Sequence, residues 1–245
     1  MTAFYLSQLS ESGRRLYHIA DRALGSRGMR GAVPPDTDMD ALLTASRYVV
    51  LDLPEYWWTK GDFTAVPSAD GRSAAIEWED LCPRHPTEET DARIFPMIEG
   101  MRLDRYAAAA DRVKALRDWM LRRVRYDPGE TRERLKTAQT PFSVFIEGRS
   151  ACMGIAGAVR MALEAYGTDC VIVLGTLFGS AETGHAWNLV RDGGRYRHVD
   201  ITMSYPQFVK MRQDLCPGSG QECLMAEYRE IALSHRILPG PDYPE

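Results

Sequence analysis

The sequence predicts an α+β protein in which helices dominate the first half of the chain and strands follow its midpoint. Apolar residues recur every three or four positions along residues 103–126, which is the spacing of an amphipathic helix. From Phe142 onward the sequence becomes apolar, with a helix signal around Cys152 and a continuous apolar run at 170–174. An Asp-Gly pair at 192–193 between two strand-like runs indicates a β-hairpin. This order of elements is typical of the α+β class.

Residues 1–102 are expected to form a mainly helical N-terminal region, whose role the sequence leaves open. Apolar residues at helical spacing predict helices over 5–24 and 38–52, and a short strand-like run follows at 73–78. Residues 103–245 are predicted to form a separate core with a C-terminal extension.

The composition of the 245-residue chain shows no electrostatic preference for polyanions. Its 34 acidic and 30 basic side chains give a net charge of -4, so neither nucleic acid nor an anionic membrane is an expected partner. Residues 1–24 lack the basic start and apolar run of a secretory signal, and no stretch reaches the roughly 20 apolar residues of a membrane helix. We therefore expect a cytoplasmic protein. Its oligomeric state is not indicated.

Five cysteines are scattered along the chain, at positions 82, 152, 170, 216 and 223. An odd number without a Cys-x-x-Cys pair indicates neither a disulfide scaffold nor a four-thiolate zinc site, so we expect no metal and no cofactor. Cys216 and Cys223 flank a Pro-Gly-Ser-Gly loop, where they either form a bridge or are simply buried. Cys170 begins a strand-like apolar run and is expected to belong to the core.

Cys152 is the first candidate functional residue because it falls in the first turn of a predicted buried helix. Ser150 is a candidate cap for this helix, and apolar residues follow Cys152 at helical spacing as far as Tyr166. The unpaired N–H groups at a helix start stabilise a thiolate, which is the nucleophilic form of cysteine. A lone cysteine on a packing face can equally be a small buried hydrophobe. Cys152 alone therefore does not identify a function.

The predicted hairpin brings His185 and Asp200 onto one face of two neighbouring strands. If Asp192-Gly193 forms the two-residue turn, His185 lies directly opposite Asp200. If Gly193-Gly194 forms the turn instead, the two residues are diagonal neighbours on the same face. Both registers bring the imidazole and the carboxylate together, and the sequence does not choose between them.

A histidine paired with a carboxylate can act as the base for a cysteine nucleophile. The carboxylate accepts from one ring nitrogen and fixes the tautomer, which leaves the other nitrogen to take the thiol proton. The competing interpretation makes His185 a satisfied core histidine and Asp200 a residue of a strand-end turn. His198 is a rival base on the same strand face as Asp200. The remaining histidines, which have no comparable setting, are His18, His85 and His235.

Three motifs in this order resemble the transglutaminase-like superfamily of papain-like cysteine enzymes. They are Cys-Met-Gly at 152–154, His-Ala-Trp-Asn at 185–188 and Tyr-Arg-His-Val-Asp at 196–200. The segment 119–127, with its Val-Arg-Tyr-Asp ending, is similar to the helix that leads into this core in bacterial members. The resemblance covers roughly residues 105–205.

The resemblance implies a papain-like core in which a central helix packs on an antiparallel sheet. It also implies that Cys152, His185 and Asp200 are a catalytic triad, with the cysteine attacking a peptide or protein amide to form a thioester. Water as the acceptor gives a peptidase or deamidase, and an amine gives a transglutaminase. The backbone N–H of Cys152 is one oxyanion donor. Gln139 and Trp187 are the further candidates for contacts to the substrate or its oxyanion.

Two differences from known motifs argue against two members of this superfamily, the arylamine acetyltransferases and the peptide N-glycanases. The approach to the nucleophile, Arg149-Ser150-Ala151-Cys152, lacks the Arg-Gly-Gly-x-Cys pattern of arylamine acetyltransferases, and the paired zinc ligands of peptide N-glycanases are absent from the sequence. Two other functions remain alternatives. One is an inactive binding or scaffold protein that retains the core, and the other is a tailoring enzyme acting on a small peptide or amide.

Overall fold

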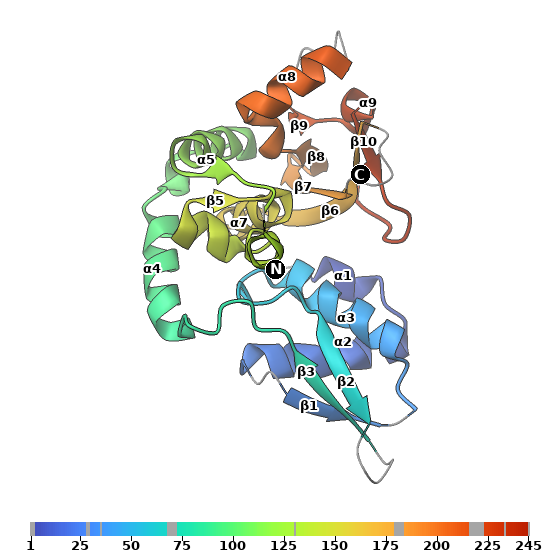
Figure 1. Cartoon of the computed structure of the whole chain (residues 1–245). Helices are drawn as coiled ribbons and strands as arrows, with labels where there is room; N and C mark the ends of the chain where they lie inside the picture. Colours follow the sequence, from blue (N-terminus) through green and yellow to red (C-terminus); the bar gives the residue numbers. More distant parts are fainter. Residues whose placement is uncertain are drawn as a thin grey trace. The chain divides into compact units, whose positions relative to one another are not determined.

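The computed structural model describes residues 3–27, 30–34, 36–67, 73–129, 131–178, 184–215, 223–232 and 234–244 (Figure 1). The chain divides into two compact units, an N-terminal unit that ends at Arg84 and a second unit over His85–Glu245. Across these described ranges, no helix combines the length and the apolar character that a membrane crossing requires.

Over its described residues, the N-terminal unit holds three helices and a small sheet, and the helices make up the larger part. Its elements are α1 (Phe4–Ser7), α2 (Glu11–Gly25), β1 (Arg30–Val33), α3 (Met39–Asp52), β2 (Phe63–Pro67) and β3 (Ala74–Trp78). The three strands form an antiparallel sheet in the order β1-β3-β2. Side chains of β3 alternate between buried and exposed, so one face of the sheet packs on the helices. Ser10 and Asp38 cap α2 and α3 with side-chain oxygens, which explains where these two helices begin.

The second unit holds a five-stranded antiparallel sheet and the helix that begins at Cys152 (Figure 1). Its helices are α4 (Thr87–Glu99), α5 (Ala109–Arg123), α6 (Arg132–Thr137), α7 (Cys152–Ala165), α8 (Pro206–Leu215) and α9 (Tyr228–Ile231), with short helical turns η1 (Leu103–Arg105), η2 (Ser143–Glu147) and η3 (Thr202–Ser204). Its strands are β4 (Arg125–Tyr126), β5 (Arg149–Ser150), β6 (Cys170–Leu177), β7 (Gly184–Asp192), β8 (Arg195–Val199), β9 (Leu224–Ala226) and β10 (His235–Ile237).

The large sheet has the order β10-β6-β7-β8-β9, so β7 lies at its centre. α7 packs against β6 and β7, and Asn188 of β7 donates its side-chain N–H to the carbonyl of Ala156 in α7 at 3.0 Å. This buried bond ties the helix to the central strand. The α+β class and the arrangement of a helix on an antiparallel sheet are therefore as expected.

The division between the units lies at residues 84/85, whereas the sequence places it at 102/103. The helix α4, which the sequence does not predict, belongs to the second unit. The Tyr166 hydroxyl at the end of α7 lies 3.0 Å from the carbonyl oxygen of Ile98 and 2.8 Å from that of Glu99, at the end of α4. These bonds attach α4 to the core.

The predicted helix over 103–126 is shorter in the structure and begins at Ala109. Arg102 has a left-handed backbone with φ of 51°, and Ala108 is extended, so the chain turns twice before α5. Within α5 the buried positions are Val113, Leu116 and Met120, at the predicted spacing. After the helix, β4 pairs with β5 in parallel.

The turn of the β7–β8 hairpin is formed by Gly193 and Gly194, which is the second of the two predicted registers. Their φ angles are 56° and 89°, and a two-residue turn of this type requires positive φ at both central positions. Two glycines meet that requirement without strain, whereas a turn at Asp192-Gly193 places a non-glycine residue in the left-handed region. Asp192 therefore pairs with Arg195 as the last rung of the ladder.

Candidate active site

Cys152 is the first residue of α7, as the spacing of apolar residues predicts, and it is 8% exposed. The expectation that Ser150 caps this helix is wrong, because the N-cap is Ala151 and no side chain caps it. Ser150 instead lies in β5, with its hydroxyl 3.1 Å from the Ala138 carbonyl and 2.6 Å from the Ser143 hydroxyl. The start of α7 therefore keeps backbone N–H groups that no capping side chain uses.

The residue two positions after Cys152 is a glycine, Gly154, because the structure leaves no room for a side chain there. A Cβ atom here would lie 2.6 Å from the Thr140 carbonyl and 2.7 Å from the Ala138 carbonyl. The 138–140 segment thus rests directly on the first turn of α7, and the Ala138 carbonyl also accepts the Ala151 N–H at 2.9 Å. Gln139, the predicted second oxyanion donor, is half-buried within this segment.

His185 and Asp200 meet through a hydrogen bond of 2.7 Å between Nε2 and Oδ2. The Gly-Gly register makes them diagonal neighbours, since β8 ends at Val199 opposite Asn188. The backbone N–H of Asp200 donates to the Cys223 carbonyl at 2.6 Å, which fixes the chain just beyond β8. The structure therefore brings two of the three predicted triad members together.

The charge of Asp200 controls the protonation of His185. Burial alone lowers the pKa of His185, but the negative charge of Asp200, its hydrogen bond and the neighbouring Cys152 outweigh burial and raise that pKa to about 10. Burial likewise raises the pKa of Asp200, and the interactions with His185 and His235 reverse this and hold it below its usual value. At neutral pH the arrangement favours a protonated imidazole beside an ionised carboxylate.

Cys152 lies beside this pair, and its thiol adds to the effects that raise the pKa of the His185 imidazole. Because Nε2 of His185 is bonded to Asp200, Nδ1 is the nitrogen left for the thiol. A cationic imidazole next to a cysteine at a helix start stabilises the thiolate. The three side chains thus lie together in the order that the sequence predicts for a cysteine nucleophile, its base and an orienting carboxylate.

The expectation that His235 has no setting comparable to that of His185 is wrong. Its Nε2 lies 2.9 Å from Oδ2 of Asp200, the same oxygen that His185 contacts, and its Nδ1 lies 2.8 Å from the Ser234 hydroxyl. His235 is separated from Asp200 by 35 positions and comes from β10 at the sheet edge. No local pattern in the sequence links the two residues.

Tyr126 is a further side chain near the nucleophile. Burial raises its pKa, and the charges of Cys152 and then Asp200 add to this effect. Its ring packs edge-on against Phe208, with centroids 4.6 Å apart. The signal in the sequence was the Val-Arg-Tyr-Asp ending of the helical segment, which carried no assigned role.

Trp187 and His198 form a separate pair beside His185. The Trp187 indole N–H donates to Nδ1 of His198 at 2.9 Å, and its ring stacks on His185 with centroids 5.9 Å apart. An oxyanion contact from Trp187 would need this hydrogen bond to break, because indole has one N–H. Burial, and next the charge of His235, lowers the pKa of the rival base His198 to about 4. His198 is therefore directed to Trp187 rather than to Cys152.

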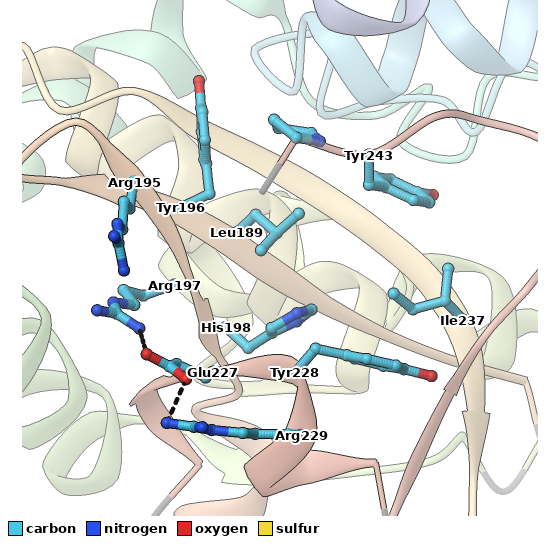
Figure 2. A pocket seen from close by; sticks show the side chains of 11 residues that line it. Leu189, Arg195, Tyr196, Arg197, His198, Glu227, Tyr228, Arg229, Ile237 and Tyr243 are labelled. Carbon is cyan, nitrogen blue, oxygen red and sulfur yellow. Dashed lines mark hydrogen bonds and ion pairs between the residues drawn. The ribbon is translucent and has the colours of Figure 1, made fainter.

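A cavity of about 620 Å³ opens beside His198 (Figure 2). Figure 2 shows Tyr228 next to the His198 ring, and Glu227 bridging Arg197 and Arg229 at the rim. The three predicted triad residues are not among its lining residues. The cavity thus neighbours the Trp187–His198 pair and is separate from the nucleophile.

Among the described residues, one group of side chains offers three metal-ligating atoms close together, namely His185, Asp200 and His235, with these atoms within 4.8 Å of one another. Both imidazole Nε2 atoms lie at hydrogen-bonding distance from one carboxylate oxygen. Hydrogen bonds from the two imidazole N–H groups to Asp200 explain why these three side chains lie so close together.

Residues 101–201 match the model of the transglutaminase-like superfamily. This part of the chain is a transglutaminase-like domain. The match spans Cys152, His185 and Asp200 and confirms the resemblance drawn from the three motifs. It leaves the N-terminal unit and residues 202–245 outside.

The chain is also similar to named relatives and to solved structures over part of its length. The kyphoscoliosis peptidases of Mus musculus and Homo sapiens are 31% and 30% identical to the chain over 101 residues, which are 38% of this chain and 15% of each relative. A solved transglutaminase (TGase) is 15% identical, with a TM-score of 0.43 over 58% of this chain and 44% of that one. A candidate cysteine protease from Cytophaga hutchinsonii is 16% identical, with a TM-score of 0.36 over 72% and 70%.

Proposed function

We propose that the protein is a cysteine-dependent enzyme that processes amides through a thioester on Cys152. The observation that carries this proposal is the buried hydrogen bond between His185 and Asp200, with Cys152 beside the same imidazole at the start of α7. The match of residues 101–201 to the transglutaminase-like superfamily model supports it, and so does the name peptidase of the two curated relatives.

The reaction follows from the positions of these groups. The Cys152 thiolate attacks the amide carbonyl carbon, and the protonated His185 gives its Nδ1 proton to the departing amine as the C–N bond breaks. The oxyanion of the tetrahedral intermediate is stabilised by the Cys152 backbone N–H, with Gln139 as the proposed second donor. Water or an amine then attacks the thioester, loses a proton to His185 and releases the thiolate.

The proposed substrate is the amide of a peptide or protein. Attack by water makes the protein a peptidase or deamidase, and attack by an amine makes it a transglutaminase. The triad serves both outcomes, because the acceptor is chosen by access to the thioester and not by the nucleophile.

Alkylation of Cys152 by iodoacetamide tests the proposal without a known substrate. We expect rapid labelling at neutral pH, read by mass spectrometry of the Cys152 peptide, and a large loss of this rate in His185→Gln because the thiolate loses its cationic partner. Cys170 is an internal control, since burial raises the pKa of its thiol and it should stay unlabelled in the folded protein. A Cys152 that reacts no faster than an ordinary thiol would overturn the enzyme proposal.

A further inference from the structure

His235 is the second histidine bonded to the aspartate of the triad. Its Nε2 lies 2.9 Å from Oδ2 of Asp200, and His185 contacts the same oxygen at 2.7 Å. The His235 side chain is 0% exposed, and that of Asp200 is 2% exposed. Oδ1 of Asp200 has no hydrogen-bond partner among the described residues. Both side-chain hydrogen bonds to this carboxylate therefore come from imidazoles, and both reach the same oxygen.

The protonation of His235 follows from its two contacts. An ionised carboxylate only accepts, so Nε2 of His235 carries a proton. The Ser234 hydroxyl lies 3.1 Å from the Ile231 carbonyl and 2.8 Å from Nδ1 of His235. If the hydroxyl donates to the carbonyl, Nδ1 must also carry a proton and His235 is a cation. If it donates to Nδ1, His235 is neutral. In both cases His235 donates to Asp200.

We propose that His235 is a positioning residue of the active site, which orients Asp200 toward His185 and limits how much carboxylate charge His185 receives. This inference rests on the function proposed above. A carboxylate held by one imidazole can turn about its terminal bond, whereas two donors from different strands fix its plane. Ser234 fixes the His235 ring in turn.

The location of His235 gives the C-terminal part of the chain a role in the site. His235 begins β10, the edge strand that pairs with β6 through His235 and Leu177. β10 therefore supplies a side chain that contacts Asp200, from beyond the part of the chain that matches the superfamily model. A chain that ends before β10 lacks the second donor to Asp200.

Loss of His235 should raise the basicity of His185. Without the second donor Asp200 becomes a stronger acceptor, and without a cation nearby the imidazolium of His185 is more stable, so both protonation states of His235 predict the same sign. The titratable groups that face the His185–Asp200 pair are Cys152 on α7, His235 on β10, Tyr126 on β4 and, beyond Trp187, His198 on β8.

The test compares the pH dependence of Cys152 alkylation in the wild type, His235→Ala and His235→Gln. We expect the alkaline inflection, at which His185 loses its proton, to move up by about half to one pH unit in His235→Ala. Glutamine keeps one N–H donor, so His235→Gln should restore most of the wild-type profile. The Ser234→Ala variant leaves the imidazole in place and should give a smaller shift, which keeps the test valid if His235→Ala does not fold.

His198→Gln is the matched control, because His198 is also a buried histidine of the same sheet but bonds to Trp187. It should lower the thermal stability without moving the inflection. If the profiles of the folded His235 and Ser234 variants superimpose on that of the wild type, His235 is only a core residue and the inference is wrong. If wild-type Cys152 itself shows no enhanced reactivity, the proposed function falls first and this inference falls with it.

Discussion

Asp52 in the N-terminal unit and Asp200 in the second unit are both buried carboxylates, with 1% and 2% exposure, but their partners differ in kind. Oδ1 of Asp52 accepts the Tyr5 N–H at 3.0 Å, and Oδ2 accepts the Leu6 N–H at 2.9 Å and the Tyr17 hydroxyl at 3.2 Å. These donors lie at the start of α1 and on α2, so Asp52 joins three helices through both of its oxygens.

Asp200 receives its side-chain hydrogen bonds at one oxygen, and both come from imidazoles. An imidazole gains and loses protons near neutral pH, whereas backbone N–H groups do not. Burial by itself therefore does not distinguish a structural carboxylate from one for which we propose a role in catalysis. The distinction lies in whether the donors can change their charge.

Among the variants that test this comparison, Asp200→Asn should have the largest effect, which is a loss of Cys152 reactivity. Without the negative charge, burial dominates and the pKa of His185 falls, so the Cys152 thiolate loses its cationic partner. We expect the alkylation rate at neutral pH to drop by about 10²-fold or more. The same rate in Asp52→Asn should equal that of the wild type, and an equal loss in both variants would contradict the assignment.

The pH dependence of stability should come from the second unit. Because the folded pKa of His185 is about 10 and its ordinary value is 6.5, its contribution to stability is complete below pH 6.5 and is lost as the pH rises toward 10. The slope of the unfolding free energy in this window is at most about 1.4 kcal/mol per pH unit for one proton. Urea unfolding at several pH values should show this slope in the wild type and in Asp52→Asn but not in His185→Gln.

Substitution of Asp52 by alanine should affect stability alone. It leaves the Tyr5 and Leu6 N–H groups and the Tyr17 hydroxyl without their acceptor, which we expect to cost about 2–4 kcal/mol. Chemical denaturation gives the loss, and Cys152 alkylation under native conditions should be unchanged. A stability equal to that of the wild type would show that water satisfies these donors.

Gly154→Ala should have the smallest effect on stability and a local effect on the nucleophile. The added Cβ would press on the Ala138 and Thr140 carbonyls, which we expect to cost about 1–3 kcal/mol and to displace the first turn of α7. Gly184→Ala is the matched control, because a Cβ atom added there meets no atom within 4 Å beyond its chain neighbours and its φ is not positive. Alkylation of Cys152 should slow in the first variant only.

Patterns that act over a few residues were readable from the sequence. The helical spacing places Cys152 at the start of α7, and either hairpin register places His185 and Asp200 on one face. The choice of register depended on the φ angles of Gly193 and Gly194, which the sequence allows but does not impose. Cys216 lies outside the described residues, so the two alternatives for it and Cys223, a bridge or simple burial, both remain as the sequence left them.

Contacts between distant segments were not readable in the same way. The role of Ser150 depends on the 138–140 segment folding back over α7, and its local resemblance to a helix cap was misleading. The cytoplasmic location and the substrate also stay predictions, because no local pattern in the sequence specifies either of them.

The sequence by itself determined the α+β class, the start of α7 and the shared face of His185 and Asp200, because periodicity and turn chemistry act between near neighbours in the chain. Only the tertiary structure decided that Asp200 is shared with His235, because that contact requires β10 to pair with β6. Strand order in a sheet is set by packing across the whole unit, and a histidine at a sheet edge carries no signal of the residue it will meet.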